Sequence, residues 1–273
     1  MYAFVHFIVG LLILPLACLV LASDIMAHPA TSRLEAVQQA GELRVCIWPA
    51  YFAVSYRNPQ SNRLEGIDID LAGEFAADLG VRPTFVDTSF VAFMDELEND
   101  RCDVAMFSVG VTEERSRRVA FSAPYLCSDV YAVTTKTQRR VKIWEDIDQA
   151  GVVVAVQIGT YMEPLMRRLL KQAQILIVAP PRTREAEVRS GRADVFISDY
   201  PYTRRMLLFY DWTRVIEAPA PISPTNYAYA VKRGDPAWLA RVDAFVAAIK
   251  KDGRLAGAAA RHGLSAIVVP GCS

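Results

Sequence analysis

The sequence has few residues of the kinds that most catalytic and nucleic-acid-binding sites require. Only 3 of its 273 residues are histidine, which argues against a Ser–His triad, a Cys–His protease or a His-rich metal site. It also lacks a glycine-rich loop with the spacing of a phosphate-binding motif. Lys and Arg number 30, as do Asp and Glu, so charge provides no reason to expect nucleic acid. We predict no catalytic residue, no metal and no cofactor.

One long apolar run lies near the start of the chain, and no later run is long enough to cross a membrane. Residues 3–22 are almost wholly apolar and small residues follow, which is typical of a secretory signal. The candidate cleavage points are Ala22, Ala27 and Ala30. We favour Ala27 and a signal peptide of residues 1–27, although a run of about 20 residues would also suit an uncleaved membrane anchor. Cys18 is interpreted as part of this run and not as a lipoprotein cysteine. The expected location is the periplasm.

Beyond the leader, the chain alternates segments typical of strands and helices. Strands are expected at 43–47, 83–86 and 103–109, and helices at 33–39, 71–79 and 90–97. After an extended stretch at 122–135, strands follow at 152–156, 175–178 and 194–197, with helices at 161–171 and 184–190. A further extended stretch at 226–231 precedes a helix at 236–249. This alternation predicts parallel α/β sheets.

Two α/β units joined by two extended crossings predict a two-lobed fold. Lobe 1 would be discontinuous and comprise residues 40–126 plus 226–270. Lobe 2 would be inserted, comprising residues 127–225 with the hinge crossings. The natural cleft of such a fold lies between the lobes, at the carboxyl ends of the strands.

A candidate anion-binding site follows the third expected strand. Gly110 allows close approach of the backbone to a ligand, Thr112 can cap a short helix, and Arg115 lies one turn later. The planar guanidinium suits bidentate capture of a carboxylate. Taken alone, Arg115 could equally be a surface residue, because Arg117 and Arg118 follow on the same helix.

Several motifs occur in an order that resembles a known family. They are the Gly-hydrophobic-Asp-hydrophobic-Asp run at 66–70, Thr112-x-x-Arg115, the Phe-Ser-x-Pro-Tyr run at 121–125, and residues 228–233 before the Trp238 helix. From about Gly41 to Gly263 the chain is similar to family 3 bacterial solute-binding proteins, the periplasmic amino-acid receptors of ABC importers. The resemblance implies a type II periplasmic binding fold whose lobes are mostly parallel sheets flanked by helices. It also implies a small amino-acid-like ligand, an ABC permease in the inner membrane as partner, and a monomer.

The resemblance also implies a ligand site. Arg115 matches the residue that binds the α-carboxylate, and Ser108 and Gly110 match strand-end contacts beside it. In lobe 2, Gln157 and Thr160 belong to a strand–turn at a helix start, where free N–H groups favour an anion.

The matching acid in lobe 2 is Asp199. It would bind the ligand's ammonium, although a helix N-cap is an alternative role for it.

Aromatic residues occupy the positions that line the side-chain pocket in these relatives. They are Trp48, Tyr51 and Phe90. Receptors for Lys, Arg or His frequently carry an acid at the position of Trp48. Because an uncharged wall cannot offset the desolvation of a cation, we predict a neutral, apolar or aromatic ligand side chain. Ordinary core packing is the alternative role of Tyr51 and Phe90.

Four cysteines follow the leader, and an even number in an exported chain allows disulfides. In the implied fold, Cys46 and Cys102 lie on neighbouring strands, and the pair is similar to one in relatives linked to methanol oxidation. Cys127 and Cys272 would form the second pair. Free, buried thiols are the alternative.

Two other functions compete with the receptor. Exported cyclohexadienyl dehydratases share this fold, but loss of water and CO₂ from prephenate or arogenate needs a buried general acid. We expect that acid just beyond Asp199, where the chain has Tyr200, Pro201 and Tyr202 but no Glu. The other is a sensor or partner-docking protein, which an uncleaved N-terminus would favour.

Overall fold

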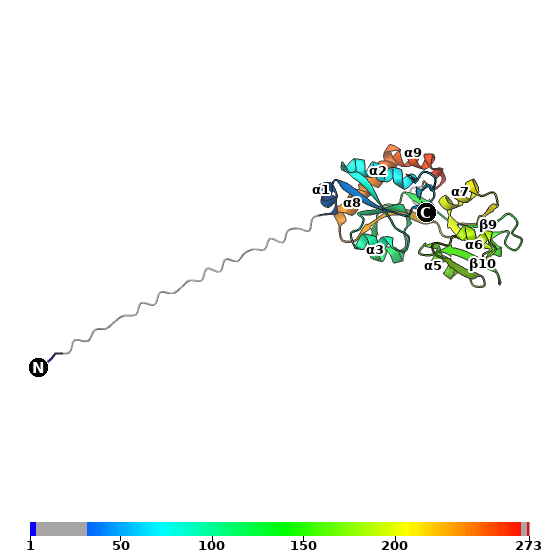
Figure 1. The fold of residues 1–273 in the computed structure, drawn as a ribbon, viewed down its shortest axis with the longest axis horizontal. Helices are drawn as coiled ribbons and strands as arrows, with labels where there is room; N and C mark the ends of the chain where they lie inside the picture. The colour runs from blue at the N-terminus through cyan, green and yellow to red at the C-terminus, as the bar shows by residue number, and fades with distance from the viewer. Residues whose placement is uncertain (4–31, 269–271, 273) are drawn as a thin grey trace. The chain divides into compact units, whose positions relative to one another are not determined.

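The computed structural model describes residues 1–3, 32–268 and 272 (Figure 1). Most of the predicted signal peptide, with Cys18 and the cleavage points, lies outside these residues. Among the described residues, no helix has both the length and the apolar character needed to span a bilayer.

The first of two sheets has the strand order β5-β1-β6-β14-β7, with β8 also paired to β14. Its strands are β1 (Glu42–Ile47), β5 (Arg82–Asp87), β6 (Val104–Gly110), β7 (Val119–Phe121), β8 (Leu126–Ser128) and β14 (Thr225–Lys232). The accompanying helices are α1 (Arg33–Ala40), α2 (Ile67–Leu79), α3 (Phe93–Glu98), α4 (Glu113–Arg118), α8 (Pro236–Asp252) and α9 (Arg254–Arg261). A small antiparallel sheet contains β2 (Ala50–Tyr51), β3 (Ser55–Arg57) and β4 (Leu64–Glu65). We call these elements lobe 1.

The second sheet has the strand order β11-β10-β12-β9-β13. Its strands are β9 (Val130–Thr135), β10 (Val153–Gln157), β11 (Gln174–Val178), β12 (Val195–Asp199) and β13 (Thr213–Ile216). The helices around it are α5 (Met162–Leu169), α6 (Arg184–Arg189) and α7 (Tyr200–Phe209). We call these elements lobe 2. Short 3₁₀ turns occur at Trp144–Asp146 and Ser265–Ile267.

The predicted two-lobed α/β fold is confirmed, with mixed sheets. Strands β5, β1 and β6 are parallel, as are β11, β10 and β12. The strands that follow each crossing, β9 and β14, run antiparallel to their neighbours. The expected extended stretch at 122–135 is divided between the sheets, because β8 pairs in lobe 1 and β9 in lobe 2. The residue limits given above for the lobes stay predictions.

Local sequence explains how lobe 1 presents its strand ends. Helix α2 buries Leu71, Phe75 and Leu79, the apolar positions at a spacing of four. It ends at Gly80, whose φ of 70° is left-handed and suits glycine. Helix α3 begins at Phe93 and not at residue 90. The hydroxyl of Ser89 accepts from the N–H of Ala92 at 3.2 Å, which forms a turn before the helix.

Both predicted cysteine pairs are bonded in the structure. The Cα atoms of Cys46 and Cys102 are 5.6 Å apart, and those of Cys127 and Cys272 are also 5.6 Å apart. The backbone N–H of Cys272 donates to the side-chain oxygen of Asn226 at 2.7 Å. The second disulfide therefore holds Cys272 against β8, after which the first crossing begins, and β14, at which the second crossing ends.

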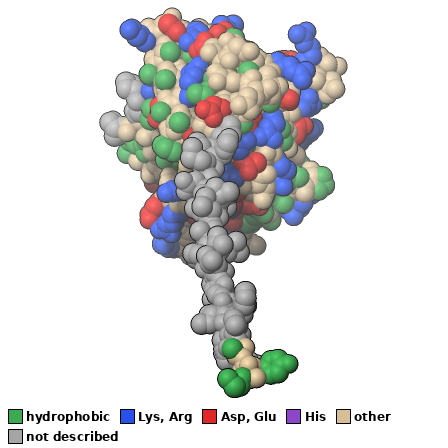
Figure 2. Space-filling model, turned by 90° about the vertical axis from the view of Figure 1, so that its left-hand side faces the viewer, with side chains coloured by type: hydrophobic (Ala, Val, Ile, Leu, Met, Phe, Trp, Pro, Cys, Tyr) green, Lys and Arg blue, Asp and Glu red, His purple; other side chains and the backbone are tan. Residues whose placement is uncertain are grey.

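Charged side chains of both signs are interspersed over the face in Figure 2. The described surface on this side therefore agrees with the balanced composition.

Candidate functional site

A small cavity lies between the lobes, where β6 and β12 end. Its volume is about 20 Å³, enough for about one water molecule. Six predicted site residues line it: Trp48, Tyr51, Phe90, Ser108, Thr160 and Asp199. The other lining residues are Tyr161, Met162, Arg184, Ser198 and Tyr202. We call this space the interlobe cavity.

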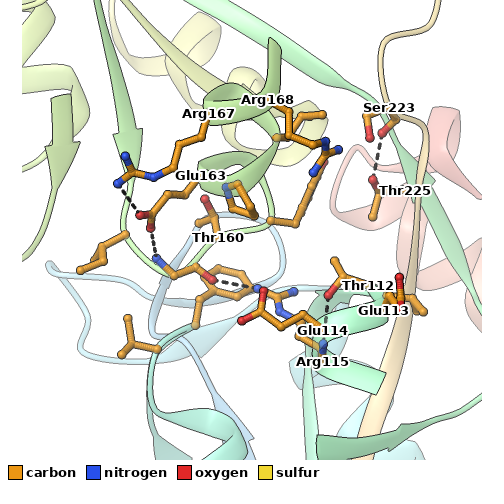
Figure 3. Close-up of a pocket in the computed structure, with 18 of the residues that line it drawn as sticks. Thr112, Glu113, Glu114, Arg115, Thr160, Glu163, Arg167, Arg168, Ser223 and Thr225 are labelled. Atoms are coloured by element: carbon orange, nitrogen blue, oxygen red, sulfur yellow. Dashed lines mark hydrogen bonds and ion pairs between the residues drawn. The ribbon is translucent and has the colours of Figure 1, made fainter. Parts of the chain in front are cut away.

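A larger groove of about 810 Å³ adjoins the cavity and shares Phe90, Thr160 and Tyr161 with it. Arg115 lines this outer groove, where it lies below Glu163 and Arg167 of α5 (Figure 3). The predicted contacts Gly110 and Gln157 line neither space.

Arg115 is directed inward although it lies on a short, charged helix. Its side chain is 5% exposed. One terminal nitrogen donates to the carbonyl of Gly110 at 2.8 Å and the other to the carbonyl of Gly159, in lobe 2, at 2.9 Å. The guanidinium carbon lies 5.5 Å from the ring centres of both Phe90 and Phe93. Burial lowers the pKa of Arg115 to about 10, so the group remains a cation at neutral pH.

The neighbouring arginines of α4 differ in their partners. Arg117 pairs with Glu113, and its side chain is 72% exposed. Arg118 pairs with Asp95 and Glu98 at the surface. No described carboxylate lies within 4.0 Å of the nitrogens of Arg115. Of these three arginines, Arg115 alone reaches the interlobe region, and it alone has no acidic partner among the described residues.

Asp199 ends β12, caps α7 and also faces the cavity. One carboxylate oxygen accepts the N–H of Tyr202 at 3.3 Å. The other accepts the hydroxyl of Tyr227 at 2.8 Å and the hydroxyl of Tyr51, and both tyrosines belong to lobe 1. Burial raises the pKa of Tyr51 and of Tyr227 well above the usual value, so both hydroxyls remain protonated donors. The N-cap role and the cavity position are therefore compatible.

The three predicted aromatic residues form one cluster. The ring centre of Phe90 is 5.2 Å from that of Trp48 and 5.9 Å from that of Tyr51. Phe90 also packs on Phe107 in the core at 5.1 Å. These side chains are packed and line the cavity at once, so the two roles considered for Tyr51 and Phe90 are not exclusive.

Ser108 is held at the strand end by a buried carboxylate. Its φ of 50° is in the left-handed region, which is uncommon outside glycine. The N–H of Ser108 donates to Asp68 at 2.8 Å, and the hydroxyl of Tyr125 donates to the same carboxylate at 2.6 Å. Desolvation raises the pKa of Asp68 to about 6, against the opposing effect of these hydrogen bonds. Asp68 therefore positions the strand end without lining the cavity.

The expectation of free N–H groups in the lobe 2 turn is wrong at Gly159. Its N–H donates to the carboxylate of Glu163 at 3.1 Å, because that side chain reaches back from the first turn of α5. The hydroxyl of Thr160 donates to the carbonyl of Gln157 at 2.8 Å. The carbonyl of Gly159, which accepts from Arg115, is the group that this turn presents to lobe 1.

The absence of a side chain at Gly110 allows other side chains of the protein to lie close to its backbone. A Cβ atom there would lie 2.9 Å from the ring of Tyr161 and 3.2 Å from the methyl of Thr225. The small size of Gly110 therefore admits Tyr161 to the interlobe region.

The sequence patterns missed several cavity residues. Tyr202 lines the cavity, but the sequence shows it only as a non-acid beyond Asp199. Tyr227 donates to Asp199 without lining the cavity, and the sequence shows it only as part of an extended crossing. Arg184 carries no signal in the sequence, because four of the six residues of the helix that it begins are charged, which is typical of an exposed helix.

The two lobes, the two crossings and the cavity at the strand ends define the class of two-domain periplasmic binding proteins. The family model for bacterial extracellular solute-binding proteins, family 3, matches residues 43–264. The chain belongs to this family, which confirms the resemblance identified from the motifs.

Relatives include both an enzyme and binding proteins. A cyclohexadienyl dehydratase of Pseudomonas aeruginosa is 30% identical over 245 residues, covering 89% of this chain and 91% of that protein. The L-cystine-binding protein TcyJ of Escherichia coli is 25% identical, covering 81% of this chain and 82% of that protein. An ancestral amino-acid-binding protein, described as a precursor of cyclohexadienyl dehydratase, is 29% identical with a TM-score of 0.78, covering 84% of this chain and 99% of that one.

Proposed function

We propose that the chain is a periplasmic receptor that binds an amino acid between its lobes and delivers it to an ABC permease. The proposal depends chiefly on one arrangement. Among the described residues, Arg115 is a buried cation without an acidic partner that faces the interlobe region from lobe 1. Asp199 faces this region from lobe 2 as a buried carboxylate whose described partners are hydroxyl and amide donors. These two charges suit the carboxylate and the ammonium of a zwitterion.

The contacts that now join the lobes indicate how such a ligand would enter. Arg115 donates to the carbonyl of Gly159, and the hydroxyl of Tyr51 donates to Asp199. A ligand carboxylate would replace the carbonyl, and a ligand ammonium would replace the tyrosine hydroxyl. Because the cavity is only about 20 Å³, the lobes must part to admit the ligand, and they would close again around it. The permease would then recognise the ligand-bound closed form.

The crossings between the lobes suit a hinge. Asp129 lies in the first crossing, between β8 and β9. Its carboxylate accepts the N–H groups of Ile222 and Ser223, which lie in the second crossing before β14, each at 2.8 Å. The crossings are thereby held together while the lobes at either side remain separate sheets. Both disulfides, which suit an oxidising compartment, support the periplasmic assignment.

The relationship to a dehydratase makes an enzyme on this fold the second candidate. Asp199 is the only acidic residue that lines the described interlobe cavity. Glu185 lies behind Tyr202 and accepts its hydroxyl at 2.7 Å, without lining the cavity. Glu113, Glu114 and Glu163 line the outer groove and not the cavity. No further carboxylic acid among the described residues therefore lines the cavity to protonate a leaving hydroxyl, and the receptor is the function that the site supports better.

A thermal-shift screen of the purified protein against the twenty amino acids, with turnover assays on prephenate and arogenate, tests the proposal. A ligand at one hundred times its Kd stabilises by about 2.7 kcal/mol, which raises Tm by about 5–10 °C in a protein of this size. We expect such a shift with at least one amino acid and no turnover. Turnover of either compound, or no shift with any amino acid, would contradict the receptor assignment.

A further inference from the structure

A second buried arginine lies at the interlobe cavity. Only two arginines are buried in the part of the chain that the structure describes: Arg115, 5% exposed, and Arg184, 3% exposed. Arg184 is the first residue of α6 and lines the cavity from lobe 2 together with Asp199. The cavity region therefore has a cation on each lobe.

Neutral groups alone contact the Arg184 side chain. One terminal nitrogen donates to the carbonyl of Ile197 at 2.9 Å and to the hydroxyl of Ser198 at 3.2 Å. The guanidinium carbon lies 4.3 Å from the ring centre of Tyr202 and 5.4 Å from that of Phe196. The Nε atom is buried and has no hydrogen-bond partner among the residues that the structure describes. A guanidinium has five donors, so its capacity exceeds what the surrounding residues satisfy.

The nearby acids do not neutralise Arg184. Neither Asp199 nor Glu185 comes within 4.0 Å of its nitrogens among the described contacts. Glu185 instead accepts from the hydroxyl of Tyr202 at 2.7 Å and from Arg205 at 3.3 Å. Asp199 is engaged by tyrosine hydroxyls and a backbone N–H.

The balance of charge among the buried groups at the site then constrains the net charge of the ligand. Among the buried groups at the cavity and the adjoining groove, Arg115 and Arg184 contribute two positive charges and Asp199 one negative charge, which leaves one excess positive charge. The acids that line the outer groove, Glu113, Glu114 and Glu163, are not buried. A zwitterion with a neutral side chain would bring no net charge and leave Arg184 uncompensated. A buried charge without a partner is strongly unfavourable, so a ligand with a net charge of −1 fits the site best.

We propose that the ligand is an amino acid with a second anionic group, and that Arg184 is the specificity residue that binds this group. The inference rests on the proposed receptor function. Trp48, Tyr51 and Phe90 would contact the carbon chain between the charged ends. The ligand side chain would accordingly be acidic, in place of the neutral one predicted from the uncharged aromatic wall.

Isosteric ligand pairs test the proposal on the full chain by titration calorimetry. L-Glutamate and L-glutamine, and L-aspartate and L-asparagine, differ in shape very little but differ by one charge. The wild type should bind the acid of at least one pair at least about tenfold more tightly than its amide, because a charge-assisted hydrogen bond is lost with the amide. Arg184→Gln should reduce that preference to below about threefold, and Arg184→Lys should retain part of it.

The control variant lies on the same helix. Arg189 is an exposed residue of α6, so Arg189→Gln should leave the preference for the acid unchanged. A purely structural role of Arg184 would lower the melting temperature of Arg184→Gln with the preference intact, and that result would overturn the proposal. If Arg184→Gln does not fold, two other results test the proposal: the preference of the wild type for the acid over its amide, and the reduction of that preference in Arg184→Lys.

The remaining outcomes separate this inference from the proposed function. If neutral amino acids bind and acidic ones do not, the receptor stands and the acidic ligand is refuted. If no amino acid binds, both are refuted.

Discussion

Replacing Arg115 by alanine tests the proposed ligand site most directly. The substitution removes the one buried guanidinium of lobe 1 and leaves the carbonyls of Gly110 and Gly159 without their donor. We expect the lobes to fold and the affinity for the amino acid to fall.

The size of the effect follows from what Arg115 already contacts. Truncating one partner of a buried, hydrogen-bonded charge pair costs about 2–5 kcal/mol. In this structure both terminal nitrogens of Arg115 already donate to carbonyls. The free energy that a ligand carboxylate gains is therefore only the difference between a hydrogen bond to a charged acceptor and one to a neutral acceptor. We therefore expect the lower part of that range, about 2–3 kcal/mol, which is about a 30- to 150-fold increase in Kd. Arg115→Lys keeps the charge but loses the planar fork, and a smaller increase is expected.

Titration calorimetry with the best amino acid from the screen provides the measurement, and the same helix provides the control. Arg117 has a side chain that is 72% exposed and pairs with Glu113, so Arg117→Ala should bind like the wild type. Circular dichroism and denaturant unfolding should show that Arg115→Ala remains folded. An unchanged Kd in a folded Arg115→Ala protein would refute the assignment of the carboxylate site.

Two other predictions concern groups that position the site. The pKa of Asp68 is raised to about 6 from 3.8, so its protonated form stabilises the fold fully below about pH 4. That contribution, up to about 3 kcal/mol, is lost as pH rises to 6. In urea unfolding, the stability of the wild type relative to Asp68→Asn should therefore decrease from pH 4 to 6, and a constant difference between the two proteins would contradict the prediction. At Gly159, with φ of 74°, an added Cβ would lie 2.6 Å from the side chain and 2.9 Å from the backbone nitrogen of Val91. Gly159→Ala should therefore hinder closure and weaken ligand binding by about tenfold or more. The control Gly191→Ala has the same φ of 74° and no atom within 4 Å, so equal affinities of the two variants would show that this contact does not matter.

The sequence by itself determined the architecture and part of the site. Strand and helix positions depend on local periodicity, as in α2, where Leu71, Phe75 and Leu79 face the core before Gly80 ends the helix. The short apolar run at 194–197 indicated a strand, and the resemblance to the family identified Asp199 as the acid at its end. These features are local, and neighbouring residues are sufficient to specify them.

Other features depended on contacts between distant segments. The sequence does not indicate that Asp68 holds the N–H of Ser108, 40 residues away, or that Glu163 occupies the N–H of Gly159. The antiparallel course of β9 and β14 depends on which sheet each strand joins after a crossing.

The partners of the arginines were decided only by the tertiary structure. Arg115, Arg117 and Arg118 are equivalent in a sequence, and Arg184 belongs to a segment whose composition suggests a surface helix. Folding buries Arg115 and Arg184 at the interlobe region and leaves Arg117 paired at the surface. The physical reason is that the cost of a buried charge depends on which groups from other segments come within hydrogen-bonding distance.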